Sequence, residues 1–126
     1  MKFALLASLL LTASAVQASS YNCFSHEEMG PVHTMTIAAA RMTSDMNGRQ
    51  FSARTVVVKE GNTVIMHADG VGSVTAKKIA LTLLEGGDMA MGSVTMNKTM
   101  PGRLSGKVTV LGSDSLVIDM SCVTKK

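Results

Sequence analysis

Apolar and polar residues alternate with a period of two along much of the chain, which is the pattern of strands that bury one face. The clearest case is residues 102–122, where two apolar runs flank the turn-forming sequence Gly112-Ser113-Asp114-Ser115. In the second run, one parity contains only apolar residues and a cysteine: Leu116, Ile118, Met120 and Cys122. The pattern predicts a closing β-hairpin whose last strand points Cys122 toward the core.

Similar runs precede this hairpin and are separated by short turn signals. Strands are expected around Cys23 and over residues 32–42, 51–59, 63–68, 71–84 and 89–96. The turns between them are expected at Asn47-Gly48, residues 60–62, Asp69-Gly70, residues 85–88 and residues 97–102. Residues 38–42 also fit a helical turn, but we favour a strand throughout 32–42.

These signals predict an all-β fold: a small antiparallel meander of about eight strands, with no long helix. A meander of this length must curl shut or stack on itself to protect its edge strands. We therefore expect a closed or nearly closed β-barrel, with a two-sheet sandwich as the alternative.

The first 18 residues are expected to be a secretory signal peptide rather than part of the fold. Lys2 precedes an apolar run over residues 3–11, and Val16-Gln17-Ala18 supplies small residues at a cleavage site. The apolar run is too short to span a membrane, and no later stretch is long enough. Residues 19–126 then form a single exported domain, periplasmic or secreted.

The chain contains two cysteines, Cys23 and Cys122. In an oxidising compartment such a pair is most simply a disulfide, and here it would join the first and last strands. Closing a loop of about 100 residues adds roughly 4 to 5 kcal/mol in the chain-entropy model. Neither a Cys-x-x-Cys motif nor a cysteine cluster for zinc is present, so we expect a structural bond.

Methionine is unusually frequent, with 11 residues against one tyrosine, three phenylalanines and no tryptophan. Thioethers are soft ligands suited to Cu(I). On strands, His33 and Met35 share one face, and Met89 and Met91 share another, so these four residues are the candidate Cu(I) ligands. The alternative, which we favour, is that methionine fills a core poor in aromatic residues. No other cofactor is expected.

No catalytic motif stands out in the sequence. His26-Glu27-Glu28 starts like a metalloprotease helix, but Gly30 occupies the position of the second histidine. A nucleophile elbow, a phosphate-binding loop and a dinucleotide fingerprint are also absent. We therefore expect a protein without catalytic activity.

Charge and composition narrow the range of partners. Basic and acidic residues are interspersed and aromatic residues are scarce, which argues against nucleic acid as a partner. The leading expectation is an exported binding protein whose ligand is an envelope or extracellular protein or a small apolar molecule. The alternatives are a periplasmic Cu(I)-binding module and a secreted enzyme inhibitor or structural envelope protein.

Overall fold

Nine β-strands make up the computed structural model of the chain, which describes residues 19–26, 32–86, 89–111 and 115–125. They are β1 (Ser20–Ser25), β2 (His33–Ile37), β3 (Arg41–Ser44), β4 (Gln50–Glu60), β5 (Thr63–Val74), β6 (Lys78–Glu85), β7 (Met89–Met100), β8 (Arg103–Val110) and β9 (Leu116–Lys125). Within these ranges no helix is long and apolar enough to cross a membrane. The predicted signal peptide and most of the predicted turn at 112–115 lie outside the described residues.

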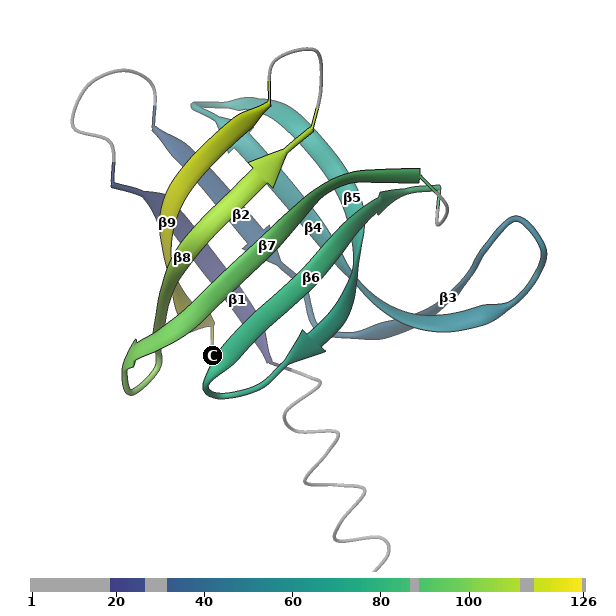
Figure 1. Ribbon diagram of the computed structural model, residues 1–126, viewed down its shortest axis with the longest axis horizontal. Helices are drawn as coiled ribbons and strands as arrows, with labels where there is room; N and C mark the ends of the chain where they lie inside the picture. Colours follow the sequence, from purple (N-terminus) through teal and green to yellow (C-terminus); the bar gives the residue numbers. More distant parts are fainter. Residues whose placement is uncertain (1–18, 27–31, 87–88, 112–114, 126) are drawn as a thin grey trace, which may run out of the picture.

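Eight of the strands close into a barrel (Figure 1). Neighbours around the ring are β2, β1, β9, β8, β7, β6, β5 and β4, and pairing between β2 and β4 completes the circle. Every pairing is antiparallel. The predicted barrel is confirmed in preference to the sandwich, and closure leaves the eight ring strands without a free edge along most of their length.

The predicted strand over residues 32–42 is two strands, which raises the count from eight to nine. Strand β2 pairs with the second half of β4 and ends at Ile37, opposite Val56. The chain then bends over residues 38–40 and returns as β3, which pairs with the first half of β4. Because β4 has 11 residues, it is long enough to serve both partners in turn.

The predicted turn at Asp69-Gly70 is wrong, because both residues lie inside β5. Gly70 is paired with Arg54 on one side and with Leu83 on the other. A Cβ atom at this glycine would lie 3.0 Å from Cγ2 of Val56 and within 3.1 Å of a leucine methyl. Glycine is therefore used here for close packing in the interior, and β5 runs on to a turn at residues 75–77.

The barrel interior is filled by side chains of its own strands, as alternation along each strand predicts. This core consists of Tyr21, Cys23, Met35, Ile37, Val56, Val58, Met66, Ala68, Ile79, Leu81, Leu83, Val94, Met96, Leu104, Val108, Ile118, Met120 and Cys122. Four of its members are methionines, so part of the methionine content does fill the core.

The disulfide Cys23–Cys122 is formed, as predicted, and joins β1 to β9 inside the barrel. The two residues face each other in the strand register, with their Cα atoms 4.0 Å apart. Their sequence separation is 99 residues. A single covalent bond therefore fastens the first strand of the barrel to the last.

The two ends of the barrel are named here by the chain segments that lie at each. We call the end with the start of β1 and the finish of β9 the terminal end; the turns at 75–77 and 101–102 also lie there. The opposite end, with the turn at 61–62, is the loop end. In Figure 1 the terminal end is at the bottom of the barrel, where the C-terminus is marked.

Candidate functional site

At the terminal end, Tyr21 and Arg54 close the mouth of the barrel. Arg54 has the same strand parity as the core residue Val56, so its side chain enters the mouth from β4. Its Nη1 atom donates hydrogen bonds to the carbonyl oxygens of Ser19, at 2.5 Å, and Ala38, at 3.3 Å. One guanidinium therefore connects β4 with the start of β1 and the chain that follows β2.

This guanidinium is a buried cation, because Arg54 is only 5% exposed. Burial lowers the pKa of Arg54 from its ordinary value, and the neighbouring Tyr21 raises it in part. Arginine nevertheless keeps its charge at neutral pH. Beside Tyr21 lies a surface pocket of about 300 Å³, whose wall includes Lys98, Leu104 and Thr124. The mouth thus combines the buried positive charge of Arg54 with a surface pocket beside Tyr21.

A two-stranded arm, residues 41–53, projects from the barrel (Figure 1). It consists of β3, the turn at 45–49 and the first four residues of β4. Pairing of β4 with β5 begins only at Arg54, so the arm has left the wall before that point. Within the described residues β3 pairs only with β4, and its outer edge is free.

The tip of the arm is held by Asp45. Its Oδ1 atom accepts hydrogen bonds from the backbone N–H groups of Asn47 and Arg49, both at 2.9 Å. Gly48, whose φ is 80°, supplies the left-handed turn position, as the Asn47-Gly48 signal predicted. Met46 stands at this ordered tip with 84% of its surface exposed.

The foot of the arm is tied to the barrel wall by Arg41. Its Nη2 atom lies 2.9 Å from Oδ1 of Asp69 on β5 and 3.1 Å from Oγ1 of Thr55 on β4. A pocket of about 300 Å³ lies between the arm and the wall, bordered by Phe51 of the arm and by Val71 of β5. The arm therefore has a defined position and leaves a partly apolar hollow beside it.

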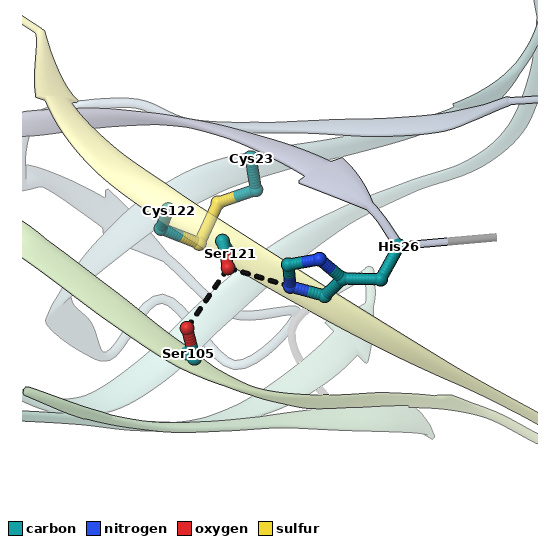
Figure 2. Close-up of a disulfide and its surroundings, with 5 residues drawn as sticks. All are labelled: Cys23, His26, Ser105, Ser121 and Cys122. Atoms are coloured by element: carbon teal, nitrogen blue, oxygen red, sulfur yellow. Dashed lines mark hydrogen bonds between the residues drawn. A yellow bond between two sulfur atoms is a disulfide. The ribbon is translucent and has the colours of Figure 1, made fainter. Parts of the chain in front are cut away.

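A third feature is a hydrogen-bonded row on the outside of the barrel, shown in Figure 2. Ser121 lies next to Cys122 in sequence and points to the opposite face of β9. Its Oγ atom is 2.6 Å from Nε2 of His26 and 2.8 Å from Oγ of Ser105. The backbone N–H of His26 also donates to the carbonyl of Asp119, at 3.2 Å.

A serine hydroxyl within hydrogen-bond reach of an imidazole is the first requirement of a nucleophile and its base. Ser121, however, is only 4% exposed, which leaves little room for a substrate carbonyl at its oxygen. Among the described residues, no carboxylate contacts the His26 ring to orient it. The three side chains therefore form a hydrogen-bonded link between the residue that follows β1 and strands β9 and β8.

The sequence did not reveal this row. Counting outward in equal steps from the predicted turn at 112–115 pairs Ser105 with Cys122, whereas in the structure Ser105 is opposite Ser121, one position away. His26 comes from the other end of the chain, and only barrel closure brings it to β9.

The four candidate Cu(I) ligands are distributed over two strands. His33 and Met35 share the buried face of β2, as predicted. Met89 is exposed at the start of β7, and Met91 is partly buried against the core. Strands β2 and β7 are separated by three strands in either direction around the ring, so the two pairs come from opposite walls. The Cu(I) site stays a prediction.

A metal site built from nitrogen and oxygen ligands is a separate question from a Cu(I) site built from thioethers. His33 Nε2 lies 3.9 Å from a carboxylate oxygen of Glu60 at the loop end. In the described part of the chain, no three His, Cys, Asp or Glu side chains lie close enough to hold a metal ion. This finding does not concern the methionine thioethers.

Comparison of the chain with protein-family models, with curated proteins and with solved structures gave no match.

Proposed function

We propose that this is a non-catalytic binding protein that engages a protein partner through the arm. The observation that carries the proposal is the contrast between a filled interior and a projecting arm with a free strand edge. The core residues fill the barrel, so a small apolar molecule is a less suitable ligand than a surface partner. A secreted enzyme inhibitor would be one form of this function.

The occupant we propose for the free edge of β3 is an extended segment of the partner. A free edge presents unpaired backbone N–H and C=O groups that a further strand can use, which is a recurring mode of peptide recognition. Two apolar side chains flank this edge: Met42 on β3, which is 63% exposed, and Met46 at the tip. Methionine suits such a surface because its flexible thioether adapts to different partners.

Site-specific photo-crosslinking tests the position of the partner. A photo-reactive amino acid in place of Met42 is expected to give a discrete cross-linked species in extracts of the source compartment, identifiable by mass spectrometry. The same residue in place of Thr82, which is exposed on the wall of β6, should not give that species. The identified partner is then purified and its affinity measured for Met42→Lys, with an expected loss of at least about tenfold.

Two results would contradict the proposal. Equal cross-linking from Met42 and Thr82 would show that the arm is not the binding surface, and cross-links between two copies alone would show self-association in place of a partner.

The absence of catalysis is tested separately with a serine-reactive fluorophosphonate probe. Labelling of Ser121 that is lost in His26→Ala would show an active nucleophile and overturn that part of the proposal.

A further inference from the structure

Five exposed cationic residues gather at the terminal end: Lys77, Lys78, Lys98, Arg103 and Lys125. They come from the turn before β6 and from the ends of β6, β7, β8 and β9, which are consecutive in the ring. Lys98 donates its backbone N–H to the carbonyl of Lys77, at 2.8 Å. The sequence spreads these residues over almost fifty positions, and only the barrel brings them to one end.

Strand pairing makes the arc continuous. Arg103 is opposite Val123 on β9, and Lys125 is opposite Ser20 at the start of β1. The buried guanidinium of Arg54 adds a sixth positive charge in the mouth, which the arc borders on one side. We name the five exposed residues the basic arc.

Carboxylates do not neutralise the basic arc in the part of the chain that the structure describes. Asp45 and Asp69 are engaged in ion pairs with Arg49 and Arg41 on the arm. Glu60 and Glu85 end their strands at the loop end, and Asp119 is opposite Lys107 on the wall. Positive charge is therefore concentrated at one end of the barrel axis.

The basic arc also includes an exposed apolar turn between two of its cations. The turn between β7 and β8 carries Met100, which is exposed, followed by Pro101. Lys98 and Arg103 flank this turn on either side. An apolar tip between cations is suited to an interface at which the apolar group enters the acyl boundary and the cations meet anionic headgroups.

We propose that the terminal end docks on an anionic lipid bilayer surface. The cations lie along an arc over four strands instead of converging on one point, so an extended anionic surface contacts more of them than a single small anion would. Such a surface attracts each basic residue separately, and the contributions add. This inference rests on the basic arc and is independent of the arm.

Vesicle co-sedimentation tests the proposal with the purified chain lacking residues 1–18. We expect binding to vesicles of phosphatidylglycerol and phosphatidylcholine at low salt, and a steep decline as salt is added. Pure phosphatidylcholine vesicles should bind far less. Loss of one basic residue is expected to lower the partition coefficient about fivefold, so Lys98→Gln with Arg103→Gln should lower it about 25-fold.

The matched control is Lys59→Gln with Lys107→Gln, which removes the same charge from exposed positions outside the arc. It should change the partition coefficient by less than about twofold, because these cations lie outside the arc and Lys107 is opposite Asp119. Thermal unfolding of both double variants checks that the fold is intact.

Each of three results would overturn the proposal: equal losses in the two double variants, equal binding to neutral and anionic vesicles, or no binding to anionic vesicles at low salt. Binding to a soluble polyanion such as heparin without binding to vesicles would also do so, because it would assign the arc to a polymer. Met100→Ser is expected to weaken vesicle binding without altering heparin binding, which separates insertion from charge.

Discussion

The closed barrel and its arm are parts of one sheet, but they differ in strand pairing and in burial. In the barrel, each strand pairs on both sides and one face of each is buried. In the arm, β3 has one partner, and Met42 is exposed where the equivalent residue of a barrel strand would be covered. The same alternating pattern therefore gives a sealed core in one region and an available surface in the other.

This difference separates stability from binding. Changes in the barrel are expected to alter the free energy of unfolding strongly, because burial and closure stabilise it. Changes in the arm are expected to leave that free energy almost unaffected and to act on partner binding. The four predictions below test this separation, from the largest expected effect to the smallest.

The largest effect is expected from removing the disulfide. Cys23→Ala with Cys122→Ala should lower the free energy of unfolding by about 4 to 5 kcal/mol, because the loop of about 100 residues is no longer closed in the unfolded chain. Denaturant unfolding of the double variant and the oxidised wild type measures the difference. A loss below about 1 kcal/mol would show that strand pairing alone secures the β1–β9 seam.

Two methionines give the most direct comparison of barrel and arm. Met35 is 1% exposed inside the barrel, whereas Met42 is 63% exposed on the arm. Met35→Ala should cost about 2 to 4 kcal/mol, because it removes buried apolar atoms and leaves a cavity. Met42→Ala should stay within about 0.5 kcal/mol. Similar losses in the two variants would mean that the arm is packed in solution.

Alternation along the chain predicted most of the barrel strands and pointed Cys122 toward the core, whereas the disulfide was predicted because the chain contains only two cysteines. Alternation was insufficient for the arm. Residues 32–42 read as one strand, since the break at Ala38–Ala40 contains neither proline nor glycine. The break arises because β4 is longer than β2, so β2 can pair with only part of it and β3 pairs with the rest. This difference in strand length is a property of the tertiary structure.

The candidate surfaces were harder to predict for the same reason. The basic arc joins residues from 77 to 125, and no local window contains a notable basic stretch. His26 and Ser121 are 95 positions apart and meet only at the seam. Asp69-Gly70 is a turn signal by composition, but interior packing at Gly70 outweighs the local preference.

Arg54 tests the region where the barrel passes into the arm. Arg54→Met removes the two hydrogen bonds to the carbonyls of Ser19 and Ala38, but also relieves the desolvation of a buried charge. Because hydrogen bonds from charged donors are stronger than those from neutral donors, and the two carbonyl groups would lose them, we expect a net loss of about 2 kcal/mol in thermal or denaturant unfolding. The control Arg49→Met, on the exposed arm, should change it by less than about 0.5 kcal/mol. A gain in stability for Arg54→Met would show that desolvation dominates.

The smallest effect on global stability is expected from the tie between arm and wall. Asp69→Asn weakens the ion pair with Arg41, which is partly exposed, so the free energy of unfolding should fall by no more than about 1 kcal/mol. Local opening of the arm should nevertheless increase, because this contact connects its foot to β5. Hydrogen exchange should therefore accelerate in peptides covering residues 41–53 and remain unchanged in β7 and β8. The control Asp119→Asn changes an exposed carboxylate on the barrel wall and should not affect the arm. Faster exchange throughout the barrel would contradict the separation, since it would mean that the arm helps to hold the barrel closed.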